Sequence, residues 1–130
     1  MRNLRLTLKS HWFYLTKAEK TEDYREINQY WFKRLVYDYK KVFNYCTGYN
    51  WDDDYMRDEG IDHICKSKLK MFDFVPFYKN IMTLGYPKAG ETSKILELQH
   101  LGIEIRTGKP EWGAEPDKLY FVIKHGPETV

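Results

Sequence analysis

The chain has 130 residues, the size of one ordinary domain, and its net charge is only +2. Such a weakly basic balance excludes a global positive field, so any nucleic-acid site must be a local patch. Cys46 and Cys65 lack Cys-x-x-Cys spacing, which argues against a zinc site and a disulfide framework. No apolar run is long enough to span a bilayer and the N-terminus lacks an apolar signal core. We therefore expect a cytoplasmic protein with reduced thiols, no metal and no cofactor.

The N-terminal third predicts a strand, a helix and a second strand. Leucines alternate with polar residues over 4–9, the pattern of a half-buried strand. Ser10 can cap a helix that begins at His11. We expect a second strand over 21–27 and a helix or tight turn over 29–35.

The middle of the chain is less regular. Apolar spacing over 36–43 predicts an amphipathic helix that continues the preceding one. Residues 44–60 are acidic and contain glycine breakers, which favours an exposed loop or short helix. A strand is expected over 71–77, and Pro76 confines it to a sheet edge or end.

The C-terminal part is rich in predicted strands. After a loop at 85–90, residues 93–106 form the longest strand-like run, which Gly102 can bend or bulge. A turn over 108–117 leads to a final strand over 118–125. Five or six short strands with small helices between them favour an α+β fold with a small β-barrel over a doubly wound sheet.

The most informative segment spans residues 18–25, which read AEKTEDYR. In an extended segment every second side chain shares a face, so an acid should lie beside a guanidinium. The alternation puts Thr21, Asp23 and Arg25 on one face and Lys20, Glu22 and Tyr24 on the other.

This segment resembles the signature of the ASCH family, small PUA-like β-barrel domains whose motif is Gly-x-Lys-x-x-Glu-x-Arg. Ala18 stands at the glycine position and Asp23 at the glutamate position. Residues 36–70 have no counterpart, so we expect a single domain over 1–130 with an insertion there. The other segments that look like the family, and like a phage- or prophage-type member in particular, are 4–9, 11–15, 85–87, 95–98, 108–114 and 120–123.

Without the resemblance, the charged residues of this segment would be interpreted as solvated ion pairs on a strand. The resemblance implies instead that they line a cleft for RNA or a nucleotide-like ligand. Lys20 would contact phosphate or act as a base, while Asp23 and Arg25 orient each other and the ligand. Trp112 is either packed over the barrel end or a stacking platform. The expected binding residues are Lys20, Asp23, Tyr24, Arg25, Tyr86 and Trp112.

The resemblance also raises a hydrolase hypothesis. Some ASCH members remove acetyl from acetylcytidine with a lysine, a threonine three residues later and a glutamate on a later strand. Lys20 matches the lysine and Glu97 the glutamate, but Asp23 replaces the threonine. A carboxylate cannot form the ester that a hydroxyl nucleophile forms. The alternative is a ribonuclease, for which the candidates are Lys20, Tyr24, Arg25, Glu97 and one of His11, His63, His100 and His125.

Acidic residues gather within the expected insertion. A calcium loop starting at Asp52 would need glycine at its sixth position and glutamate at its twelfth, which hold Arg57 and His63. We instead expect residues 50–62 to be a mobile acidic appendage that guards one rim of the cleft. The predicted function is RNA or nucleotide binding, with a hydrolase as one alternative. The other is a phage accessory protein that binds a host protein through the acidic segment.

Overall fold

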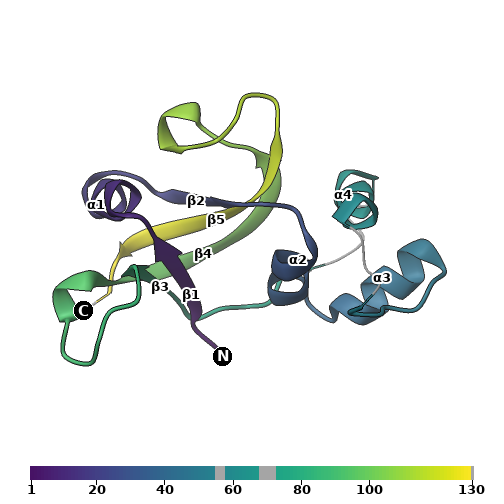
Figure 1. The fold of residues 1–130 in the computed structure, drawn as a ribbon, viewed down its shortest axis with the longest axis horizontal. Coiled ribbons are helices and arrows are strands. Elements are labelled where there is room, and N and C mark those ends of the chain that lie inside the picture. Colours follow the sequence, from purple (N-terminus) through teal and green to yellow (C-terminus); the bar gives the residue numbers. More distant parts are fainter. Residues whose placement is uncertain (55–57, 68–72, 130) are drawn as a thin grey trace.

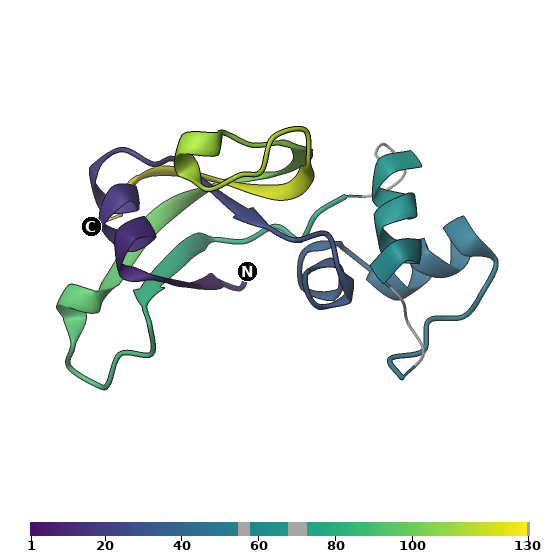
Figure 2. The ribbon, with the colours of Figure 1, turned by 45° about the horizontal axis from the view of Figure 1, so that its top comes forward.

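The computed structural model describes residues 1–54, 58–67 and 73–129. Its centre is a curled five-stranded mixed sheet with the strand order β1-β3-β4-β5-β2 (Figures 1 and 2). The predicted α+β class is confirmed, and the sheet forms a half-barrel with β1 and β2 as its edges. The strands are β1 (Leu4–Leu8), β2 (Glu22–Arg25), β3 (Lys79–Leu84), β4 (Ile95–Thr107) and β5 (Leu119–Glu128).

The described helices divide between two places. Helix α1 lies beside β2 at one end of the sheet, whereas α2, α3 and α4 lie together beyond the other end (Figures 1 and 2). The helices are α1 (Ser10–Ala18), α2 (Gln29–Leu35), α3 (Tyr39–Thr47) and α4 (Asp58–Ser67), with short 3-10 turns η1 (Thr92–Lys94) and η2 (Pro110–Trp112).

Strand pairing follows the hydrophobic alternation. Leu4, Leu6 and Leu8 of β1 are buried, and β1 pairs in parallel with β3, while the other pairs are antiparallel. The predicted bulge in β4 is confirmed, because the register of β4 against β5 shifts around Gly102. Gly102 has φ 107, a value that favours glycine.

Three local predictions were wrong. The strand predicted over 71–77 is not found, and β3 lies further along the chain instead. In the described part of 71–77, only Phe74 forms a β-bridge, and its partner is Val36. Residues 71–72 lie outside the described residues. Helix α3 does not continue α2, because Asp38 adopts φ 52 and interrupts the helix. Ser10 does not cap α1, since Lys9 occupies that position without a side-chain hydrogen bond.

The helical end, which consists of α2, α3 and α4, shares the sheet's hydrophobic core. Phe32, Phe43 and Ile61 belong to the same buried cluster as the leucines of β1. Trp51 stacks on Phe32 with ring centroids 5.9 Å apart. The predicted mobile appendage over 50–62 is therefore wrong at both of its ends, because Trp51 packs on the core and Ile61 is fully buried. Between them, the side chains of Asp52, Asp53 and Asp54 are exposed, as expected.

Candidate functional site

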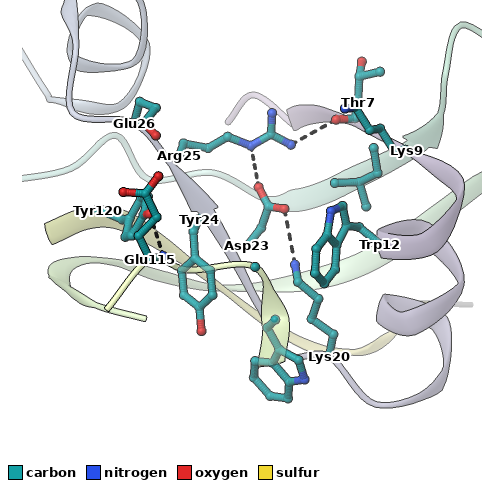
Figure 3. A pocket seen from close by; sticks show the side chains of 13 residues that line it. Thr7, Lys9, Trp12, Lys20, Asp23, Tyr24, Arg25, Glu26, Glu115 and Tyr120 are labelled. Carbon is teal, nitrogen blue, oxygen red and sulfur yellow. Dashed lines mark hydrogen bonds and ion pairs between the residues drawn. The ribbon is translucent and has the colours of Figure 1, made fainter. Parts of the chain in front are cut away.

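A cleft of about 330 Å³ lies where the two edge strands of the half-barrel approach each other (Figure 3). Strand β1 and the start of α1 form one side, β2 forms the other, and the segment that contains η2 closes a third. Its lining includes Thr7, Lys9, Trp12, Lys20, Asp23, Tyr24, Arg25, Glu26, Trp112, Gly113, Glu115 and Tyr120.

Lys20 is buried in the wall of this cleft, with only 3% of its surface exposed. Its Nζ lies 3.4 Å from Oδ1 of Asp23. Alternation predicted these side chains on opposite faces, and this was wrong because β2 begins only at Glu22. The backbone N–H of Lys20 still donates to the carbonyl of Leu15 at the end of α1. Burial lowers the pKa of the Lys20 amine, and the Asp23 carboxylate offsets that effect only in part.

Asp23 links two cations. Its Oδ2 accepts a hydrogen bond of 2.5 Å from Nε of Arg25, so the predicted acid beside a guanidinium is present. Nη2 of Arg25 donates to the carbonyl of Thr7 at 3.1 Å, across the gap between β2 and β1. The guanidinium also lies 4.9 Å from the ring centroid of Trp31. Both cations are thus held by one buried carboxylate, which fixes their positions.

Aromatic rings surround the Lys20 amine. Nζ lies 6.0 Å from the ring centroid of Trp12 and 5.8 Å from that of Tyr24. The Tyr24 hydroxyl donates to Oε1 of Glu22 at 2.7 Å and accepts from the backbone N–H of Lys109 at 2.9 Å. Burial, with the Glu22 contact, raises the pKa of Tyr24 to about 12. Tyr24 is therefore a neutral donor at physiological pH.

The η2 segment is packed tightly against these rings. A Cβ on Gly113 would lie 3.0 Å from the indole of Trp12, and one on Gly108 would lie 2.6 Å from the ring of Tyr24. Gly113 has φ 100, which also favours glycine. The neighbouring Trp112 is partly exposed, and Nζ of Lys109 lies 4.2 Å from its ring centroid. Trp112 is thus a partly exposed member of the cleft lining.

Acidic side chains form the opposite rim. Glu26 and Glu115 line the cleft, and Nζ of Lys118 lies 2.8 Å from Glu26 and 3.9 Å from Glu115. The charged lining residues balance formally, with Lys9, Lys20 and Arg25 against Asp23, Glu26 and Glu115. The cleft lining therefore carries no net formal charge.

Two predicted site residues lie elsewhere. The Glu97 side chain is 46% exposed on β4 and pairs with Nζ of Lys79 at 3.8 Å, so the structure does not bring it to Lys20. Tyr86 is 92% exposed in the loop after β3. The cleft lining contains no histidine. Sequence reasoning missed Trp12 as a cleft residue, because its role depends on non-local packing against Gly113.

A buried polar row also escaped prediction. Asn80 of β3 donates from Nδ2 to the carbonyl of Lys124 at 3.2 Å and contacts Nδ1 of His125 at 2.6 Å. Nδ1 of His100 lies 2.7 Å from Oδ1 of Asn80. Because the Asn80 amide is the donor, Nδ1 of His125 accepts and the neutral ring carries its proton on Nε2. Burial lowers the pKa of His125 to about 4, and its Nε2 has no hydrogen-bond partner in the described part of the chain.

Comparison with known proteins gave no match to any family model, characterised protein or solved structure. None of the helices in the described ranges is long and apolar enough to cross a membrane. Within the same ranges, no group of three or more His, Cys, Asp or Glu side chains is placed to hold a metal ion.

Proposed function

We propose that the cleft binds one nucleotide unit, either free or within an RNA strand, and that the chain is an ASCH-type, PUA-like domain. One observation carries the proposal: Trp12 and Trp112 flank a cleft into which the paired cations Lys20 and Arg25 are built. The face of an indole ring can stack on any base. A hydrogen-bond donor in a fixed position, by contrast, selects a base by the acceptor atoms on its polar edge.

Each part of the lining has a role in this proposal. Trp112 stacks on the base, and the Lys20 amine donates to a base carbonyl oxygen. Tyr24 and Trp12 hold that amine in place. At the mouth, Lys9 and Lys109 carry the exposed charges nearest to a phosphate.

The size and charge of the cleft restrict the ligand. Ligand pockets range from about 300 to 1,000 Å³, so a volume of about 330 Å³ suits a single base with its sugar. The balanced charges of the lining argue against a polyphosphate. A base within a duplex is stacked and paired, so its face is not free to stack on Trp112.

The direct experiment is calorimetric titration of the protein with uridine, cytidine and adenosine 5′-monophosphates. Replacing Trp112 with alanine should weaken binding of the preferred nucleotide about tenfold, since stacking contributes about 1–3 kcal/mol per base. Lys20→Met keeps the buried chain length but removes the donor, and should weaken binding by a similar factor. Tyr86→Ala is the control, because Tyr86 lies outside the cleft. Equal affinities for wild type, Trp112→Ala and Lys20→Met would refute the proposal.

A ribonuclease is the second candidate, favoured by the buried Lys20 amine with its lowered pKa. As a base, Lys20 would take the proton of a 2′-hydroxyl. The 2′-oxygen would then attack phosphorus, the bond from phosphorus to the 5′-oxygen would break, and water would protonate the leaving oxygen. The products would be a 2′,3′-cyclic phosphate and a 5′-hydroxyl. Formation of a cyclic phosphate by wild type but not by Lys20→Met would support this activity; intact RNA with both proteins would exclude it.

A further inference from the structure

A second groove, of about 400 Å³, adjoins the cleft. Residues 2–5 and Thr7, which include much of β1, line it together with Phe77 on one side, and Tyr30 and Arg34 of α2 line it on the other. Thr7 lines both the groove and the cleft, so the two hollows are neighbours. Tyr30 and Arg34 also line a third hollow further along α2, together with Lys33.

The charge of this groove differs from that of the cleft. Arg2, Arg5 and Arg34 line it, and no carboxylate does. Among the described residues, none of these arginines is in an ion pair. Unpaired guanidinium groups repel one another, so a ligand that brings negative charge would relieve the repulsion.

An exposed aromatic ring lies beside these arginines. Tyr30 is 55% exposed, and the Arg34 guanidinium carbon lies 4.0 Å from its ring centroid. A partly exposed ring beside several cations is an arrangement that binds single-stranded nucleic acids, with phosphates on the cations and a base on the ring.

We propose that this groove holds the sugar–phosphate backbone of a single-stranded RNA whose terminal base occupies the cleft. The inference rests on the proposed function and specifies it, because it makes the ligand an RNA strand rather than a free nucleotide. Arg2, Arg5 and Arg34 contact phosphates of the strand, and Tyr30 stacks on a base beyond them. Charge alone would also allow an acidic peptide as the ligand. The exposed ring of Tyr30 favours RNA, because a base can stack on it.

The test compares uridine 5′-monophosphate with a hexauridylate strand, each titrated at several salt concentrations. The strand should bind at least about tenfold more tightly than the monophosphate. With three arginines on phosphates, log affinity should fall against log salt with a slope of about −2, at about −0.7 per phosphate.

Two charge-matched variants then locate the contact. Arg5→Gln with Arg34→Gln should weaken hexauridylate binding about tenfold at low salt and bring its slope about 1.4 closer to zero. The same double variant should bind the monophosphate as wild type does. Lys17→Gln with Lys88→Gln removes as much charge from exposed residues outside the groove and should change neither ligand.

The outcomes separate this inference from the proposed function. The groove proposal would be overturned if monophosphate and strand bind with equal affinity, or if the double arginine variant binds the strand as wild type does. Either result would leave the proposal for the cleft intact. Strand binding that depends on the arginines but not on Trp112 would support the groove as the site of the RNA backbone. It would overturn the proposal that the cleft binds a base. A hexaglutamate peptide that binds as tightly as hexauridylate would overturn RNA as the occupant.

Discussion

The guanidinium of Arg25 joins the two open edges of the half-barrel by donating from Nη2 to the carbonyl of Thr7 at 3.1 Å. Edge strands present unpaired backbone groups, which proteins cover or blunt. Here one arginine satisfies a carbonyl of β1 and, through Nε, holds the buried carboxylate of Asp23. The closure of the sheet and the geometry of the cleft therefore depend on the same side chain.

Replacing Arg25 with alanine should reduce both nucleotide affinity and stability. The variant loses two hydrogen bonds, and of the side-chain partners of Asp23 in the described ranges only Lys20 remains. We expect the free energy of unfolding to fall by about 1–3 kcal/mol, measured by urea denaturation. Affinity for the preferred monophosphate should fall about tenfold or more.

The matched variant is Arg25→Lys, which keeps the charge but not the planar fork that contacts Asp23 and Thr7 together. It should recover only part of the affinity. An Arg25→Ala protein that is as stable as wild type and binds equally well would contradict the role given to this residue.

The structure predicts no release of acetate from acetylcytidine above the uncatalysed rate. In the ASCH resemblance Asp23 stands where the deacetylating proteins have threonine, and it is held between Lys20 and Arg25, so it offers no hydroxyl nucleophile. Asp23→Thr, with folding checked first by circular dichroism, should release none either, because Glu97 lies away from Lys20 and pairs with Lys79. Acetate production by wild type, followed enzymatically, would show that the reasoning from Asp23 is wrong.

Neutralising the acidic segment should tighten binding of hexauridylate at low salt. Asp53 lies 3.3 Å from Nζ of Lys33, which lines the hollow next to Arg34. With Asp52, Asp53 and Asp54 changed to asparagine, the Lys33 amine becomes available to phosphate. Salt screens this electrostatic gain beyond about 10 Å, so it should be largest at low salt. Thermal melting should be nearly unchanged, because the Lys33–Asp53 pair is exposed.

A charge-matched control for this triple variant replaces Glu91, Glu97 and Glu128 with glutamine, all outside the three hollows described above. Its affinity for hexauridylate should rise much less. If both triple variants tighten binding equally, only net charge matters and Asp53 has no local role.

His125 should make stability depend on pH between about 4 and 6.5. The unfolded chain binds a proton on His125 below about pH 6.5, whereas the folded protein binds it only near pH 4. The unfolded state therefore binds more protons in this window, and stability falls as pH falls through it, by about 3 kcal/mol in total. Asp23, Lys20, His100 and Glu22 are the charged or titratable groups that act on this ring.

Urea unfolding at several pH values measures this dependence. His125→Gln should flatten the curve between pH 4 and 6.5 relative to wild type. His63→Gln, which changes an exposed histidine, should leave the curve unchanged. A wild-type slope that survives in His125→Gln would assign the dependence to His100, whose pKa burial also lowers, or to the carboxylates.

Local patterns predicted the parts of the fold that local forces determine. Alternating leucines located β1, and Gly102 located the bulge in β4. The same approach missed β3, because the alternating apolar run 71–77 gave a stronger strand signal than the nearly continuous apolar run 81–84. Residues 79–84 form a strand because they lie centrally between β1 and β4, a long-range effect.

The candidate site divides in the same way. Alternation along β2 predicted the Asp23–Arg25 pair. It could not place Lys20, whose position depends on where α1 ends, nor Trp12, which depends on the packing of η2. Glu97 entered the site only through the resemblance, and its register opposite Ile81 on the exposed face of β4 is a property of the whole sheet.

Whether a nucleotide base stacks on Trp112 in the cleft, next to Trp12, can be measured by the indole N–H signals in a ¹⁵N-resolved NMR titration with the preferred monophosphate. The chain has four tryptophans, of which Trp12 and Trp112 line the cleft, whereas Trp51 packs in the helical end. Saturating ligand should shift the signals of Trp12 and Trp112 and leave that of Trp51 in place. Trp112→Ala should remove the Trp112 signal and weaken the response of the Trp12 signal. Unmoved Trp12 and Trp112 signals, or a largest shift at Trp51, would contradict the claim.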